Sequence, residues 1–246
     1  MAAQTEDAAI GGVKLYSAWF CPFAQRAWMV LEEKRAPYEL VEIDPYDKTA
    51  EFLAVNPRGL VPAIKCANGD CVYESTVCVE FAEDAWRGEG RPALLPASAH
   101  GRAVARIWVD FVGRRVVPCF YRILQSQDAA DQAKHCAEML GHVKDISAAM
   151  APDTDFFMGD SLGVVDIALA PFAWRFGVLE HYRQFKLPDT KEYVRFRTWW
   201  DAVQRAPSFK ATTCDYNKLI AIYERYSNNT AQSGVAQAIR AGSALP

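Results

Sequence analysis

The pattern of hydrophobic and polar positions divides the chain near residue 87. Before that point, short runs of β-forming residues alternate with segments whose apolar residues recur every three or four positions. Expected strands cover residues 13–16, 38–43, 63–65 and 71–73. Expected helices cover residues 23–34, 48–55 and 76–86. Asn68-Gly69 is a strong hairpin signal between the third and fourth strands.

After residue 99 the pattern is helical almost to the end. Expected helices cover residues 102–125, 131–150, 164–179, 193–205 and 218–226. The first is long or bent, because Gly113 and Pro118 lie inside it. The third is apolar nearly all round, which predicts a buried central helix that Pro171 kinks.

The two patterns together predict an α/β domain followed by an all-α domain. The order βαβαββα over residues 13–86 is that of a thioredoxin-like sheet, with a right-handed βαβ connection. Residues 87–98 are rich in glycine and proline and are expected to be a linker, and residues 99–226 form the helical domain. Residues 1–12 are expected to be a flexible tail, and the small, polar residues 227–246 a disordered tail.

Composition and charge exclude several classes of protein. Lysine and arginine number 27 against 30 acidic residues, for a net charge of -3, which argues against a nucleic-acid surface. No apolar run approaches the roughly 18 residues of a membrane helix. Residues 1–12 lack the basic start of a signal peptide. We therefore expect a cytoplasmic protein.

The seven cysteines and four histidines add little to this interpretation, with one exception. The histidines show no zinc-ligand spacing, so no metal is expected. Cys66 and Cys71 flank the hairpin turn and could pair, but reduced thiols fit a cytosolic chain better.

Cys21 is the exception, because it sits where a thiolate is stabilised. It follows a strand, precedes Pro22 and opens a helix, so free N–H groups and the helix dipole favour the charged sulfur. Its pKa is therefore expected to be lowered. Ala24 replaces the second cysteine of a Cys-x-x-Cys motif, so an external thiol must resolve any mixed disulfide. In the cytosol the abundant thiol is glutathione.

Four further residues have the chemistry that a glutathione site requires. Val61 offers backbone pairing if its bond to Pro62 is cis, and Ser75 at a helix start offers an anion site. Glu74 can pair with the γ-glutamyl ammonium and Lys48 with the glycyl carboxylate. Each also has an ordinary interpretation: a Val-Pro turn, a plain N-cap, or solvated surface charges.

Three motifs resemble those of cytosolic glutathione transferases, most closely the omega class. They are Cys21-Pro22-Phe23-Ala24-Gln25-Arg26, Asn56-Pro57-Arg58-Gly59-Leu60-Val61-Pro62 and Tyr73-Glu74-Ser75. The resemblance implies that Cys21 forms the mixed disulfide with glutathione, the co-substrate. It also implies that Phe23 packs beside the tripeptide, which Lys48, Val61, Glu74 and Ser75 bind.

In the second half the resemblance is looser. Residues 160–168 are similar to the family's helix-start motif, in which Asp166 bonds back to the helix entry. Gly163 has no side-chain oxygen, so the reciprocal capping box is incomplete. The family pattern places Arg175 and Tyr216 on the acceptor pocket, and it implies a homodimer.

The resulting hypothesis is a glutathione-dependent thiol transferase and reductase. Its acceptor would be a glutathionylated thiol, dehydroascorbate or a glutathionyl ketone, that is, a small electrophile or disulfide. Two alternatives share the fold: an intracellular chloride-channel relative and a non-enzymatic ligand carrier. Against the first, Arg26 and the charged residues 32–35 interrupt the apolar stretch that a membrane-inserting form would use.

Overall fold

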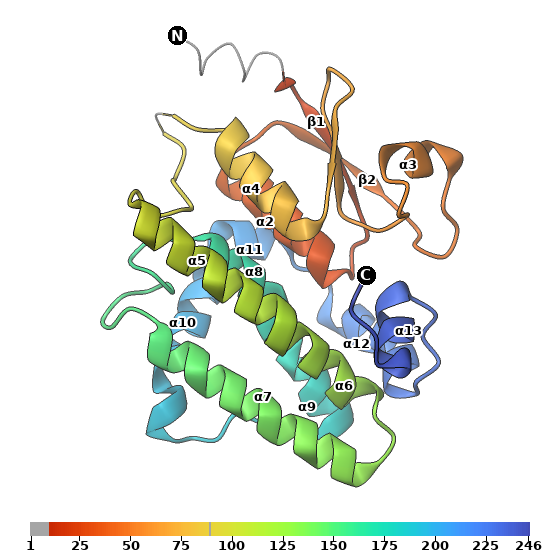
Figure 1. The fold of residues 1–246 in the computed structure, drawn as a ribbon, viewed down its shortest axis with the longest axis vertical. Coiled ribbons are helices and arrows are strands. Elements are labelled where there is room, and N and C mark those ends of the chain that lie inside the picture. The colour runs from red at the N-terminus through yellow and green to blue at the C-terminus, as the bar shows by residue number, and fades with distance from the viewer. Residues whose placement is uncertain (1–9, 89) are drawn as a thin grey trace.

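The computed structural model describes residues 10–88 and 90–246 (Figure 1). Most of the tail expected at residues 1–12 therefore lies outside the described residues. The N-terminal domain holds a four-stranded mixed sheet of order β2-β1-β3-β4. Its strands are β1 (Val13–Ser17), β2 (Tyr38–Glu42), β3 (Ala63–Lys65) and β4 (Cys71–Tyr73). β1 pairs with β2 in parallel, and the β1–β3 and β3–β4 pairs are antiparallel.

Helices cover both faces of this sheet. They are α2 (Pro22–Glu33), α3 (Ala50–Val55) and α4 (Ser75–Ala85). Successive residues of a strand point to opposite faces. Leu15 accordingly joins the main core with α2 and α4, whereas Tyr16 packs with Phe52 of α3 in a small separate cluster. The thioredoxin-like prediction is confirmed.

The second domain is helical, as predicted. Its elements are α5 (Ala99–Phe111), the π-helix η1 (Val112–Val116), α6 (Val117–Gln125), α7 (Ala129–Ala149), α8 (Val164–Trp174), α9 (Phe176–Arg183), the 3₁₀ helix η2 (Lys191–Tyr193), α10 (Val194–Arg205), α11 (Pro207–Thr212), α12 (Tyr216–Ser227) and α13 (Gly234–Ala241). Figure 1 shows α5 and α6 running side by side with α7. The main core extends without interruption from α2 and α4 into these helices.

The expected helix over residues 102–125 is one continuous helical run with a π-helical turn in its middle. Gly113 lies within that turn, and Pro118 is the second residue of α6, directly after it. α8 is buried as predicted, but it ends at Trp174 and α9 starts at Phe176. Asp166 does bond back to the helix entry, accepting from the Gly163 N–H at 2.7 Å.

The prediction of a disordered tail at residues 227–246 is wrong. The chain forms α13 there, capped by the Ser233 hydroxyl, which accepts from the Ala236 N–H. Ala231 and Ala236 are fully buried, and the Tyr226 hydroxyl donates to Ser233 at 2.9 Å. Small residues that look featureless in sequence are the ones that allow this close packing.

Candidate active site

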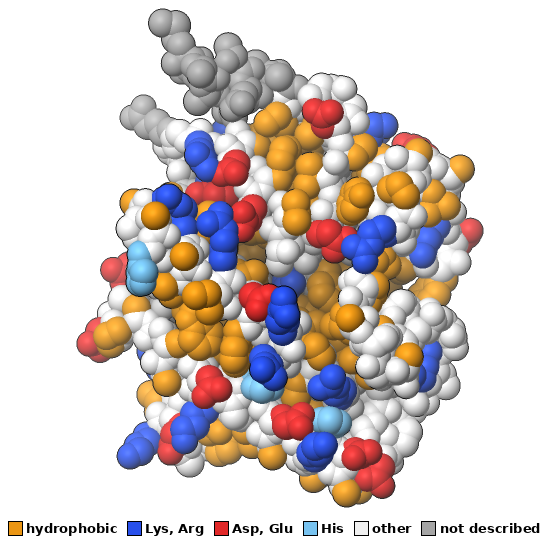
Figure 2. Space-filling view, in the orientation of Figure 1, with side chains coloured by type: hydrophobic (Ala, Val, Ile, Leu, Met, Phe, Trp, Pro, Cys, Tyr) orange, Lys and Arg blue, Asp and Glu red, His pale blue; other side chains and the backbone are white. Residues whose placement is uncertain are grey.

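A cavity of about 310 Å³ lies between the two domains. Figure 2 shows it as a hollow with hydrophobic walls between the sheet domain and the helices. The starts of α2 and α4 and the residues before β3 form one side. The π-helix, α6, α12 and the C-terminal segment form the other. The cavity is therefore lined by most of the residues that the sequence indicated as catalytic or ligand-binding.

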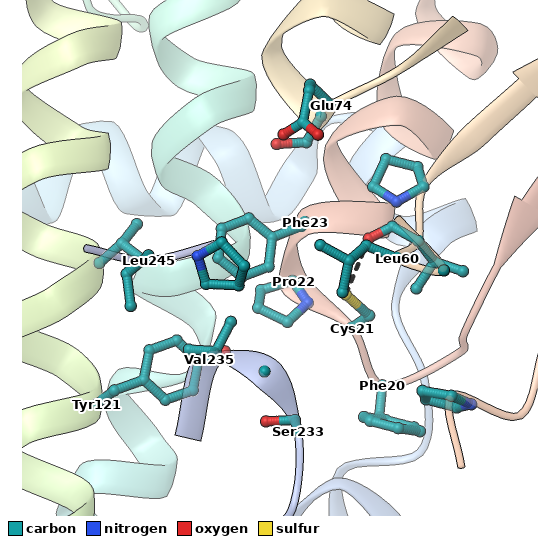
Figure 3. A pocket seen from close by; sticks show the side chains of 18 of the residues that line it. Phe20, Cys21, Pro22, Phe23, Leu60, Glu74, Tyr121, Ser233, Val235 and Leu245 are labelled. Atoms are coloured by element: carbon teal, nitrogen blue, oxygen red, sulfur yellow. Dashed lines mark hydrogen bonds between the residues drawn. The ribbon is translucent and has the colours of Figure 1, made fainter. Parts of the chain in front are cut away.

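Cys21 opens onto this cavity as the N-cap residue of α2. Its backbone is extended, Pro22 follows within the first helical turn, and its carbonyl accepts the first helical hydrogen bond from Gln25 at 3.0 Å. The Sγ atom lies 3.9 Å from the carbonyl oxygen of Val61, drawn as a dashed line in Figure 3. The Val61–Pro62 peptide bond is cis. All seven cysteines are free, so Cys66 and Cys71 do not form a disulfide.

The expected lowered pKa of Cys21 is not found. Burial raises the pKa of this thiol above its ordinary value. The N–H groups of Ala24 and Phe23 oppose that effect, as do the charges of Arg175 and Arg26. The helix start thus lowers the pKa of Cys21, as the sequence indicated, but desolvation in the interdomain cavity raises this pKa by more.

The structure brings the five predicted glutathione-binding residues to the same cavity: Phe23, Lys48, Val61, Glu74 and Ser75. Glu74 has a positive φ of 74° and forms an ion pair with Arg58. Ser75 is the first residue of α4 and not its N-cap, because Glu74 occupies the cap position. It nevertheless lines the cavity at the start of that helix, where free N–H groups favour an anion.

The Lys48 side chain, which lines the cavity, passes close over the backbone of Gly59. Gly59 adopts a φ of +62°, which favours glycine. A Cβ atom at this position would lie 3.0 Å from the Lys48 Cδ and 3.1 Å from its Nζ. The glycine therefore creates the path along which the ammonium group approaches the site.

Arg175 and Tyr216 do not line the cavity, in contrast to the expectation. Arg175 is fully buried behind it, with its guanidinium bonded to the backbone and to Gln25 and Tyr223. Tyr216 is 40% exposed and packs over Gly177 and against Trp174. The family pattern identified their positions in the chain but not the direction in which these side chains point.

The wall opposite Cys21 consists of residues that the sequence did not identify. Figure 3 shows Tyr121, Val235 and Leu245 across the cavity from Leu60 and Cys21. The other members of this wall include Gly113, Val117, Tyr223, Tyr226 and Ser233. Tyr121 and Tyr223 are almost completely buried. The spacing of apolar residues in α6 and α12 predicted burial, but it could not separate core positions from cavity positions.

No group of three or more His, Cys, Asp or Glu side chains in the described part of the chain could hold a metal ion. Among residues 10–88 and 90–246, no helix has the length and apolar character needed to span a membrane.

Comparison with known proteins gives a consistent result. The family model for the glutathione S-transferase N-terminal domain matches residues 20–85, and the C-terminal domain model matches residues 126–202. A probable glutathione S-transferase of Oryza sativa subsp. japonica, GSTU6, is 31% identical over 212 residues, covering 83% of this chain and 89% of the relative. Glutathione S-transferase omega-1 of Sus scrofa is 26% identical over 225 residues, covering 91% and 89%.

Solved structures agree with these relatives. The crystal structure of glutathione transferase Omega 3C from Trametes versicolor matches with a TM-score of 0.80 and 36% identity, covering 94% of this chain and 98% of that one. The relatives and this structure thus cover both domains of the chain. The chain belongs to the glutathione S-transferase family.

Proposed function

We propose that this protein is a cysteine-type, omega-like glutathione transferase that acts as a thiol transferase and reductase. The observation that carries the proposal is the position of Cys21. It is at a helix start and is the one cysteine among the described residues that line the cavity. A monothiol in such a position can accept glutathione but has no neighbouring thiol to expel it.

The reaction has two steps. The Cys21 thiolate attacks the glutathionyl sulfur of a disulfide R–S–SG, which forms Cys21–S–SG and releases RS⁻. The thiolate of a second glutathione then attacks the same glutathionyl sulfur, giving glutathione disulfide and free Cys21. With a glutathionyl ketone, the first attack breaks the carbon–sulfur bond, and the enolate that leaves takes up a proton.

The binding roles follow from the chemistry around the thiol. Val61 would pair with the cysteinyl backbone, and Ser75 at the start of α4 would hold the γ-glutamyl carboxylate. Glu74 would face the γ-glutamyl ammonium, Lys48 the glycyl carboxylate, and Phe23 would pack beside the tripeptide. The aromatic wall around Tyr121, and not Arg175 or Tyr216, would receive the acceptor.

We also propose a cytosolic homodimer. Val77 of α4 is 51% exposed and Ile107 of α5 is 64% exposed. The Glu80–Arg106 ion pair joins these helices beside them. Two such large apolar side chains on adjacent helices fit a second copy of the chain. Sedimentation equilibrium should give a dimer, and Ile107→Asp should weaken it.

The test of activity is a panel assay with glutathione as donor. We expect turnover with hydroxyethyl disulfide, dehydroascorbate and phenacyl-glutathione, and little with a halogenated aromatic acceptor. Cys21→Ser should abolish the reductase activities, because serine cannot form a mixed disulfide. Cys136→Ser, at another partly buried cysteine, should leave them unchanged. Full reductase activity in Cys21→Ser would overturn the mechanism. Glutathione binding without turnover would favour a ligand carrier.

A further inference from the structure

Arg26 is a buried cation at the cavity with an incomplete set of partners. It lies on α2, five residues after Cys21, and lines the cavity although it is only 2% exposed. Its Nε donates to the carbonyl of Ala168 at 2.9 Å, and its Nη1 donates to the Ser75 hydroxyl at 3.3 Å. Its Nη2 is buried and has no hydrogen-bond partner.

The surroundings of this guanidinium are apolar. Its Cζ atom lies 5.5 Å from the ring centroid of Phe23 and 5.1 Å from that of Phe172. These rings stabilise a cation only partly, and a buried charge without a counter-ion is costly. Burial lowers the pKa of Arg26 to about 10, so it stays protonated at neutral pH.

No carboxylate of the described chain compensates this charge. The groups that raise the pKa of Arg26 are Cys21 and Tyr121, and neither carries a charge in its protonated form. The ion pairs within the described residues leave Arg26 out, including the nearby Arg58–Glu74 pair. The folded protein thus holds an uncompensated positive charge beside its cavity, which favours an anionic ligand.

Ser75 links the Arg26 guanidinium to the cavity. It is the first residue of the 11-residue helix α4, and Ser75 and Thr76 at the start of this helix line the same cavity. Because the Ser75 oxygen accepts from Arg26, its own hydroxyl hydrogen is free to donate to a ligand. The hydroxyl, the helix start and the guanidinium all favour a carboxylate at one point.

We propose that Arg26 is a positioning residue for glutathione, which orients the Ser75 hydroxyl toward the γ-glutamyl carboxylate and balances the charge of that carboxylate from behind. This inference rests on the proposed function, since it takes glutathione as the ligand. The competing view is a structural one, in which Arg26 only ties α2 to α8 through the Ala168 carbonyl. The two views differ in which part of glutathione should depend on Arg26.

The experiment measures calorimetric affinities for three ligands. They are glutathione, γ-aminobutyryl-Cys-Gly, which lacks the γ-glutamyl carboxylate, and glutathione ethyl ester, in which the glycyl carboxylate is blocked. The proteins are the wild type, Arg26→Met, Arg26→Lys and Ser75→Ala. Arg205→Met, at an exposed arginine of α10, is the matched control.

We expect the wild type to bind glutathione more tightly than γ-aminobutyryl-Cys-Gly. Arg26→Met should reduce that preference by about tenfold or more, because one charge-assisted hydrogen bond is lost. Ser75→Ala should reduce it similarly, and a protein that carries both Arg26→Met and Ser75→Ala should show little further reduction. The preference for glutathione over its ethyl ester should be unchanged. Arg205→Met should change neither ratio.

Arg26→Lys keeps the charge but cannot bond both Ala168 and Ser75, so an intermediate ratio is expected. If Arg26→Met does not fold, the ratio measured for Arg26→Lys distinguishes the two views. Equally weaker binding of all three ligands would overturn the inference. So would an unchanged preference for glutathione over γ-aminobutyryl-Cys-Gly in both Arg26→Lys and Arg26→Met. Either result would leave the proposed function intact. Failure of the wild type to bind glutathione would overturn both.

Discussion

Arg175 donates its Nη2 to the carbonyl oxygen of Phe20 at 2.8 Å, one residue before Cys21. The same guanidinium donates Nη1 to the Gln25 Oε1 at 2.9 Å and Nε to the Tyr223 hydroxyl at 2.9 Å. Arg175 lies between α8 and α9, so the helical domain holds the loop and the helix that present the thiol. Folding stability and the ionisation of Cys21 should therefore both depend on this one residue.

Replacing Arg175 with methionine should lower the free energy of unfolding by about 3 kcal/mol or more, because several buried acceptors lose their donor. It should also raise the pKa of Cys21 further, since the Arg175 charge lowers it. Urea unfolding measures the first effect, and the pH dependence of alkylation by iodoacetamide measures the second. Arg175→Lys should reproduce the loss of stability with a smaller change in pKa. An unchanged Cys21 pKa in Arg175→Met would contradict the electrostatic part of this prediction.

Asp166 provides a second test. Its Oδ1 accepts from the Phe157 N–H at 2.9 Å and the Trp199 Nε1–H at 2.7 Å, and its Oδ2 accepts from Gly163. Asparagine has one acceptor oxygen, so Asp166→Asn should cost about 1–3 kcal/mol in urea unfolding. Gly163→Ser would add a cap hydroxyl but none of the bonds that the Asp166 carboxylate accepts, so it should not rescue the variant fully.

The same residue predicts a pH dependence. Burial raises the pKa of Asp166 to about 6 from the ordinary 3.8, against the opposing effect of its hydrogen-bond donors. The folded state then retains a proton that the unfolded chain releases, so the stability from this group falls as pH rises from about 4 to about 6. The free energy of unfolding of wild type relative to Asp166→Asn should decrease over that range. An increase would show that the hydrogen-bond donors, and not burial, have the larger effect on the pKa of Asp166.

The buried pair of Lys34 and Glu83 should be needed to hold the linker. The Lys34 Nζ lies 2.6 Å from the Glu83 Oε2 and donates to the Pro92 carbonyl at 2.8 Å, and Glu83 accepts from the Leu94 N–H. Lys34→Met alone should cost about 3–5 kcal/mol, because it leaves a buried carboxylate unpaired.

Combining Lys34→Met with Glu83→Gln should cost less than the sum of the single changes. An exposed pair serves as the control: Lys14 and Glu39 lie 3.5 Å apart at the sheet surface, and breaking that pair should cost less than about 1 kcal/mol. Additive losses at residues 34 and 83 would indicate that the two side chains act independently.

The C-terminal segment, residues 231–246, should control the ionisation of the thiol. Val235 and Leu245 line the same cavity as Cys21, and burial is the main cause of its raised pKa. Ending the chain after Thr230 should therefore lower the Cys21 pKa and speed its alkylation near neutral pH. Leu245→Ala should shift it in the same direction by less, with little effect on folding. A Cys21 pKa that is the same in all three proteins would show that the segment does not desolvate the thiol.

Most of the fold could be predicted because its signals are local. The strand–Cys21-Pro22–helix order and the Asn68-Gly69 turn each specify a structure over a few residues. Ser75 shows the limit of such signals, since one residue of difference in the helix start, caused by the positive φ of Glu74, changes its role from cap to first helical residue.

The far wall of the site was not predictable because it depends on tertiary contacts. Ala231 and Ala236 are buried only through packing against other helices, and nothing in their neighbours marks this. Arg175 follows an apolar helix, where a charged residue usually reaches solvent, but here the interior supplies four acceptors for it. Arg26 belonged to a recognised motif, yet its missing partner becomes visible only when the surrounding side chains are placed.

The π-helix η1 has a consequence for how the cavity wall opposite Cys21 is built. A π-helical turn holds about one residue more than an α-helical turn, and each residue of an α-helix advances the next by about 100°. If the same residues were wound as a regular α-helix instead, α6 would be rotated by about that angle relative to α5. Val117 and Tyr121 would then leave the cavity wall with no change in their identity. The π-helical turn therefore sets which face of α6 lines the cavity.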